Sequence, residues 1–246
     1  FILQAPNVKM ALEESQRLAK SPDVLVSHPV RRRPMKKMAP MAPRPNDPLF
    51  PTQWPLENRD RETGAILGPE LNIREAWAES TGKGVVIGIV DDGVDLAHTE
   101  FIGQGVDDLH FNFTNGKANG NPVAQNQTHG TVVAGIAVAK ANNGKGIAGV
   151  SPDARFASLV VWDANDNFGT EEEIADMFQY RNDRIAVQNH SWGSYTSAQL
   201  DAMVLEKQGI KRAIEQGRDG KGVVIIRGAG NSRALGWSAA DDGYSN

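Results

Sequence analysis

Residues 128–139, Thr-His-Gly-Thr-Val-Val-Ala-Gly-Ile-Ala-Val-Ala, place a histidine at the start of a predicted helix made of small and apolar residues. Thr128 is a candidate N-cap, so His129 falls in the first turn, where backbone N–H groups have no partner inside the helix. Apolar residues occur on most sides of this helix, so we expect it to be buried. A lone histidine in such a helix is more often structural than catalytic, and the rest of the sequence has to decide between the two.

The composition is that of an ordinary globular protein. The chain has 246 residues, of which 40% are hydrophobic, enough for one sizeable domain and a small appendage. A formal net charge of −4 gives no reason to expect nucleic acid as a partner, and the longest aliphatic runs are too short to span a membrane. With no cysteine, a thiol nucleophile, a thiolate zinc site and a disulfide framework are excluded.

The first 38 residues are predicted to form a small αβ unit. Residues 1–4 and 24–26 are predicted strands, and Asn7 is the candidate cap of an amphipathic helix over 8–20. Because the sequence opens with Phe1 rather than Met, we expect a processed chain.

A basic tract and an extended segment follow this unit. Residues 31–37, Arg-Arg-Arg-Pro-Met-Lys-Lys, carry five cations in seven positions, and residues 39–60 are rich in proline and lack periodicity. One short basic cluster in an acidic chain could be a nucleic-acid patch, but an exposed linker open to proteases fits better. We therefore expect 1–38 and 39–60 to lie outside a main domain over 61–246.

From residue 61 onward, predicted helices and strands alternate. The strands are apolar runs without polar alternation, which indicates a parallel sheet covered by helices on both faces, an α/β fold. The predicted strands are 85–90, 155–161, 185–190 and 223–226, and the predicted helices are 72–78, opened by an Asn72-x-x-Glu75 capping box, 129–139, 171–180 and 198–216.

Polar side chains follow three of these strands. Asp91 and Asp92 end the first, Ser191-Trp192-Gly193 follows the strand from Ile185, and Asn231 lies in the glycine-rich turn after the last. In parallel sheets, functional groups gather at the carboxyl ends of the strands. We expect these groups to meet His129 there.

Four blocks in this order resemble the subtilisin-like serine proteases. They are Val-Asp-Asp-Gly at 90–93, His-Gly-Thr-Val-Val-Ala-Gly-Ile at 129–136, Ser-Trp-Gly at 191–193 and Ala-Gly-Asn at 229–231. The double acid, Asn142-Asn143-Gly144 and the closing 242–246 are similar to the kexin and furin branch. The resemblance implies the N-terminal part of a subtilisin-like three-layer α/β/α domain with a mostly parallel sheet. It also implies that 1–38 is a propeptide remnant with a processing tract, followed by the mature N-terminal segment.

The resemblance also implies roles for single residues. Asp91 would be the carboxylate that orients His129, the general base, and Asn231 would donate its amide to the oxyanion. Ser191, Trp192 and Gly193 would form the ledge that binds the substrate. Asp92 and Asp242 match carboxylates that line pockets for basic residues, so we expect cleavage after such residues.

The nucleophile is not found among these residues. In the family it lies in a Gly-Thr-Ser block after the asparagine, and no Gly-Thr-Ser occurs in the sequence. We expect the serine on a further segment or partner chain, so that this chain alone does not hydrolyse peptides. The alternative is a catalytically dead, subtilase-like binding or regulatory protein.

Calcium is the cofactor that the resemblance implies. The matching ligands are the side chains of Asp47, Glu100 and Asn143 and the backbone carbonyls of Lys140, Lys145 and Ile147, an all-oxygen set that suits Ca²⁺. The resemblance further implies a zymogen that binds its own propeptide and a protein or peptide substrate. It implies a secreted or extracytoplasmic location, whereas the expectation of neither nucleic acid nor a membrane as partner comes from the net charge and the short aliphatic runs.

Overall fold

The computed structural model describes residues 4–29, 41–193, 200–239 and 242–243. The chain forms two compact units, Phe1–Met38 and Ala39–Asn246. In the first, the described part contains one helix, α1 (Val8–Leu18), whose N-cap is confirmed: the Asn7 side chain accepts a hydrogen bond from Met10 N at 3.0 Å. The strand predicted over 24–26 is not formed, and Leu25 is fully exposed. The strand predicted at 1–4 falls almost wholly outside the described residues.

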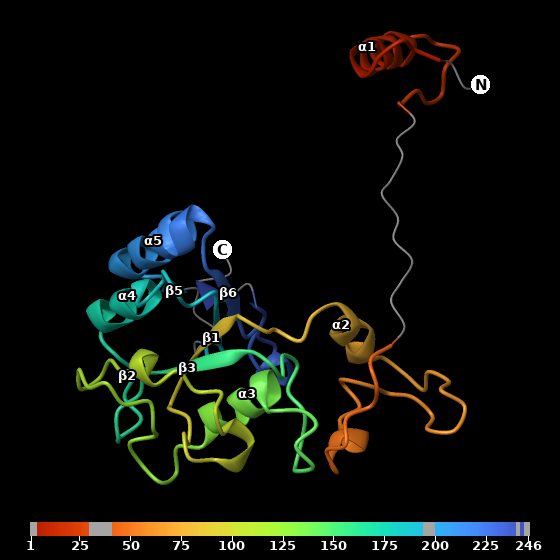
Figure 1. The fold of residues 1–246 in the computed structure, drawn as a ribbon. Helices are drawn as coiled ribbons and strands as arrows, with labels where there is room; N and C mark the ends of the chain where they lie inside the picture. The colour runs from red at the N-terminus through yellow and green to blue at the C-terminus, as the bar shows by residue number, and fades with distance from the viewer. Residues whose placement is uncertain (1–3, 30–40, 194–199, 240–241, 244–246) are drawn as a thin grey trace. The chain divides into compact units, whose positions relative to one another are not determined.

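A five-stranded parallel sheet organises the second unit (Figure 1). Its order is β2-β3-β1-β4-β6, and the strands are β1 (Val86–Asp91), β2 (Phe111–Asn112), β3 (Arg155–Val160), β4 (Val187–His190) and β6 (Val224–Arg227). Two short strands, β5 (Leu200–Asp201) and β7 (Asp242–Gly243), pair separately. Since all pairs of the main sheet are parallel, the carboxyl ends of its strands lie at one edge.

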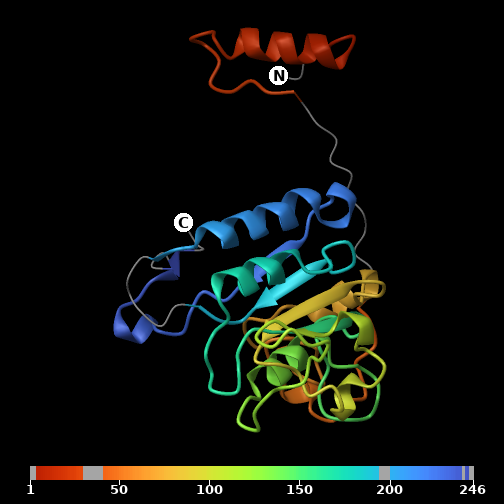
Figure 2. The same ribbon diagram turned by 90° about the vertical axis from the view of Figure 1, so that its left-hand side faces the viewer.

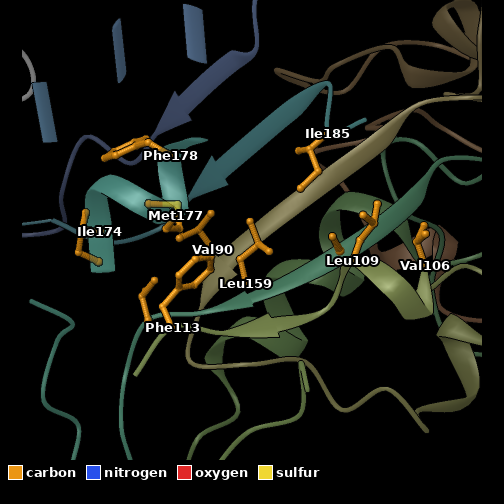
Figure 3. Packing of buried hydrophobic residues seen from close by; sticks show 11 residues of the cluster. Val90, Val106, Leu109, Phe113, Leu159, Ile174, Met177, Phe178 and Ile185 are labelled. Atoms are coloured by element: carbon orange, nitrogen blue, oxygen red, sulfur yellow. The ribbon is translucent and has the colours of Figure 1, made fainter. Parts of the chain in front are cut away.

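Helices cover both faces of this sheet. Figure 2 shows α4 (Glu171–Gln179) and α5 (Val204–Gly220) on one face and α3 (His129–Val138) on the other. Successive β1 residues point to opposite faces, so Val90 packs with Ile174 and Phe178 under α4, as Figure 3 shows. Ile89 packs on the α3 side. The predicted α/β fold is confirmed.

Shorter elements surround these layers. Helix α2 (Ile73–Glu79) packs with Phe50 and Ala148 in a cluster of its own. The part of the chain that the structure describes also contains the short 3-10 helices η1 (Phe50–Thr52), η2 (Thr99–Phe101), η3 (Asp107–Leu109) and η4 (Arg233–Leu235). None of the helices within the described ranges combines the length and apolar character needed to cross a bilayer.

Several local predictions were wrong. Asn72 does not cap α2: its φ is 51°, in the left-handed region, and its side-chain oxygen accepts a hydrogen bond from Arg59. The helix predicted from 198 begins at Val204, because 200–201 form β5. Helix α3 is not buried all round, since Val132 and Ile136 are 59% and 58% exposed.

Candidate active site

The carboxylate of Asp91 and the imidazole of His129 form a hydrogen-bonded pair. Asp91 is the last residue of β1 and His129 the first of α3, and His129 Nδ1 lies 2.8 Å from Asp91 Oδ1. Among the described residues no partner bonds Nε2, the other ring nitrogen. A carboxylate on Nδ1 favours the tautomer with its proton there, which leaves the Nε2 lone pair free to accept a proton.

Burial disfavours the charged form of the Asp91 carboxylate. Burial raises the pKa of Asp91 to about 6, while hydrogen bonds from His129 and from the backbone N–H of Asp92 oppose the rise. The second oxygen, Oδ2, is buried without a hydrogen-bond partner. The ionised form of Asp91 therefore depends on His129, as expected where a carboxylate stabilises an imidazolium.

The neighbouring acid caps the helix that carries the histidine. Asp92 accepts hydrogen bonds from the backbone N–H groups of His129, at 3.1 Å, and Gly130, at 2.7 Å. Thr128, which the sequence predicted as the cap, makes no capping bond. An anionic cap on the first turn satisfies two free N–H groups and interacts favourably with the helix dipole. Sequence reasoning missed this role because the capping acid lies 37 positions earlier in the chain.

Ser191, Trp192 and Gly193 leave the end of β4 as predicted. Trp192 donates from its indole N–H to the carbonyl of Val90 on β1 at 3.0 Å, which ties this segment to the strand that carries Asp91. Gly228 N donates to the carbonyl of His190 at 2.9 Å, so the ends of β4 and β6 are also joined. Asn231 follows in the turn after β6, exposed to solvent. Asp242 lies in β7, and its side chain is outside what the structure describes.

Residues 82–246 match the sequence profile of the subtilase family, peptidase family S8. The chain belongs to the subtilase family. Rat furin is 30% identical over 213 residues, which cover 82% of this chain and 25% of furin. Kexin of Saccharomyces cerevisiae is 30% identical over 205 residues, covering 82% and 24%. The predicted kexin and furin branch is thereby confirmed.

Two further comparisons bear on this subtilase. A calcium-dependent protease of Trichormus variabilis is 30% identical over 259 residues, covering all of this chain and 36% of that protein. A serine protease of Aeromonas sobria has a similar fold, with a TM-score of 0.65 and 23% identity over 82% of this chain and 35% of that one. The chain thus spans about a quarter to a third of the length of these relatives.

The residues predicted to hold calcium gather around one loop of the subtilase chain. Asp47 accepts hydrogen bonds from the N–H groups of Asn142 and Asn143, and Glu100 accepts from the Asn143 amide at 3.0 Å and from Ile147 N at 3.2 Å. Lys140 N donates to the carbonyl of Glu100 at 3.2 Å, and Lys145 N to the Asn143 side chain at 2.7 Å.

This loop fits a hard cation in its donor chemistry. Asp47 and Glu100 are both buried, and neither carboxylate forms an ion pair with a described Lys or Arg. Buried carboxylates are normally paired with a cation or bind a metal. Within the described ranges no group of three or more His, Cys, Asp and Glu could hold a metal ion. A cation here would therefore need amide and backbone oxygens as well.

Two residues that the sequence did not single out, His190 and Arg227, pack against the Trp192 side chain of the ledge. His190, at the end of β4, is buried against Phe178, with ring centroids 5.1 Å apart. Its burial, with a smaller effect of the Arg227 charge, lowers its pKa to about 3, so it stays neutral at ordinary pH. Arg227 lies over the Trp192 ring, 4.3 Å from its centroid. The signal in the sequence was the placement of polar residues at the ends of otherwise apolar strands.

Proposed function

We propose that this chain carries the acid–base pair of a calcium-dependent serine endopeptidase. The observation that supports this best is the 2.8 Å contact between buried Asp91 and exposed His129. His129 would take the proton of the attacking hydroxyl on Nε2 and pass it to the leaving amine. Asp91 would hold the ring and stabilise the imidazolium formed between these steps.

The oxyanion and the substrate backbone need further groups at the same edge. We assign Asn231 as the amide donor to the oxyanion of the tetrahedral intermediate, a role in which an asparagine contributes about 3 kcal/mol in a subtilisin. Ser191, Trp192 and Gly193 would bind the substrate backbone as a ledge. The tie between Trp192 and Val90 supports this, because it fixes the ledge relative to the strand that ends in Asp91.

The nucleophilic serine would come from outside these 246 residues. The sequence has no Gly-Thr-Ser block, and the β6 end of the sheet offers a place for a further segment to pack. On β6, Ile225 packs against the core cluster that contains the α4 residues Ile174 and Phe178, so its neighbours Val224 and Ile226 point to the opposite face of the sheet, where they are 48% and 50% exposed. An apolar strand face that is open to water, two places from β1 in the same sheet, supports the packing of a further segment there.

Calcium would bind at the loop that holds Asp47, Glu100 and Asn143, with the carbonyls of Lys140, Lys145 and Ile147. When bound, the ion would stabilise the fold by neutralising two buried carboxylates. The side-chain amide of Asn143, whose N–H donates to Glu100, would rotate by about 180° so that its oxygen faces the ion. A calcium-dependent protease among the relatives supports this cofactor.

We further propose a preference for basic residues before the cleaved bond. Asp92 supports it, since a carboxylate has about four acceptor positions and the cap of α3 uses two of them. Asp242 would be a second acid for the same purpose. Residues 1–38 would be a propeptide remnant cleaved near 31–37, residues 39–60 the mature N-terminal segment, and the location extracytoplasmic.

A fluorophosphonate probe, which labels only activated serines, tests this function. The 246-residue chain alone should stay unlabelled, whereas the longer natural protein or its complex with a serine-bearing chain should be labelled. Asp91→Asn and His129→Ala should each abolish labelling. A longer protein that takes up no label, although folded, would favour the alternative of a catalytically dead binding protein.

A further inference from the structure

A cavity of about 600 Å³ lies along the first turns of α3, next to Thr128, Thr131 and Val132. Of the residues predicted for substrate binding, none whose side chain the structure describes lines it. Its walls come from the segment after β1, from the loop 121–127 and from the first turns of α3. The residues that matter here are Asp95, His98, Pro122, Val123, Thr131 and Val132.

Hydrogen bonds hold these walls in place. Asp95 N donates to the Thr131 hydroxyl at 2.9 Å, which joins the segment after β1 to α3. The buried side chain of Gln127 accepts from the N–H groups of Val123 and Ala124, at 3.1 and 3.0 Å. The cavity is therefore shaped before anything enters it, which lowers the entropic cost of binding.

The cavity and the ledge lie on opposite sides of the acid–base pair. The ledge follows β4, one neighbour of β1 in the sheet. The cavity lies toward β3, the other neighbour: Val94 N donates to the carbonyl of Gly120, and Ser158 on β3 donates to that same carbonyl at 2.7 Å. A polypeptide could bind the ledge with one part of its chain and continue past His129. A side chain from the part beyond His129 would then reach the cavity.

The lining combines an apolar wall with one carboxylate. Pro122, Val123, Ala124 and the exposed Val132 offer aliphatic surface. Asp95 is exposed, one of its oxygens accepts a hydrogen bond from Ala97 N at 3.0 Å, and no described Lys or Arg forms an ion pair with it. His98, the other ionisable lining residue, accepts a hydrogen bond from Glu100 N through Nδ1.

We propose that this cavity is a separate subsite that takes one long cationic side chain, Lys or Arg, of a bound polypeptide. The methylene stem would lie on the aliphatic wall and the charged head would reach Asp95, the arrangement that amphipathic cations adopt in proteins. The assignment rests on the proposed function for its role in catalysis. Binding itself requires neither the serine nor hydrolysis.

The absence of cysteine allows a test on the chain as it is. Ala124→Cys creates a single thiol in the cavity wall, and Gln125→Cys, at the exposed rim, is the second variant should the first not fold. The rate of labelling is measured with cationic aminoethyl and anionic sulfonatoethyl methanethiosulfonate. Relative to the ratio of the two rates for a small free thiol, the cationic reagent should be favoured by a further factor of about 3 to 10, the effect of one nearby carboxylate at a partly exposed site. Asp95→Asn should remove this additional factor, and Asp219→Asn, which neutralises a distant exposed acid, should not.

Protection of the same thiol then identifies the occupant. N-acetyl-lysine methylamide should slow labelling of the cysteine variant, while N-acetyl-norleucine methylamide, which has the stem without the charge, should not. Asp95→Asn should abolish protection. Equal protection by both compounds, or protection that survives Asp95→Asn, would overturn the proposal. Because no hydrolysis is measured, such a result would leave the proposed peptidase function intact.

Discussion

Asp91 and His129 are hydrogen-bonded at 2.8 Å, yet the Asp91 side chain is only 3% exposed and that of His129 is 60% exposed. The acid lies inside the protein and the base lies at its surface. This asymmetry suits an orienting carboxylate, which should not meet solvent, and a base, which has to meet the substrate. It also means that the folded chain bears the cost of a buried charge.

Replacing Asp91 by Asn should therefore stabilise the chain at pH 7. The pKa of Asp91 is about 6 when folded and about 3.8 when unfolded, so the folded state binds the proton more tightly and stability falls as pH rises from 4 to 6. We expect Asp91→Asn to abolish this fall and to gain about 1 to 3 kcal/mol at pH 7. Urea denaturation at several pH values measures it, with Asp219→Asn as control. A variant less stable than the parent at pH 7 would contradict the expectation.

The cap of α3 can be tested by a matched pair of variants. Asp92→Ala removes the acceptor for two backbone N–H groups and should cost about 1 kcal/mol or somewhat more. Thr128→Ala, at the position that the sequence favoured, should have an effect close to zero because its hydroxyl makes no capping bond. Thermal and urea unfolding of both variants measure the difference. The reverse order of the two effects would restore Thr128 as the cap.

Glu100 should stabilise the folded chain when calcium is bound and should not stabilise it when calcium is absent. At about 100 times its Kd, calcium should stabilise the parent chain by about 3 kcal/mol. Glu100→Gln should lose that gain, yet be as stable as the parent or more stable in a chelator, because a buried charge is gone. The melting temperature with calcium and with chelator measures both, with exposed Glu62→Gln as control. A parent chain that is indifferent to calcium would rule out the metal site.

Acid should destabilise the chain through His190. Its pKa is about 3 when folded and about 6.5 when unfolded, so the unfolded state gains the proton first and stability falls as pH drops from 6.5 toward 3. The slope due to this histidine is about 1.4 kcal/mol per pH unit. His190→Gln should remove that part of the slope, whereas exposed His28→Gln should leave it unchanged. Unfolding free energies between pH 4 and 6.5 provide the measurement.

The parallel sheet was predictable because its strands are apolar runs without polar alternation. Such strands have to be covered on both faces, which is typical of a parallel sheet between layers of helices. β1, β3, β4 and β6 lie within one or two residues of the predicted ranges. The meeting of Asp91 with His129 followed from the same reasoning, since the end of a strand and the start of the next helix share one edge of the sheet. The predicted site residues after β4 and β6 lie at that edge as well.

What the sequence did not reveal depends on contacts between distant segments. Asn72 looks like a cap but bonds Arg59, and Thr128 looks like a cap but is replaced by Asp92. Both errors arise because local patterns do not register a competing partner from elsewhere in the chain. The exposure of Val132 has a different cause, because apolar character predicts burial only where another layer covers the residue.

The start of α3 is pressed directly onto the turn that carries the acids. A Cβ atom on Gly130 would lie 2.4 Å from the carbonyl oxygen of Gly93 and 2.9 Å from Asp91 Cβ. This close approach holds Asp91 and His129, which are 38 positions apart in the sequence, at their short distance. Any side chain at position 130 would therefore push the first turn of α3, and His129 with it, away from Asp91. The pairing of Asp91 with His129 therefore depends on a glycine that takes no part in the hydrogen bond between them.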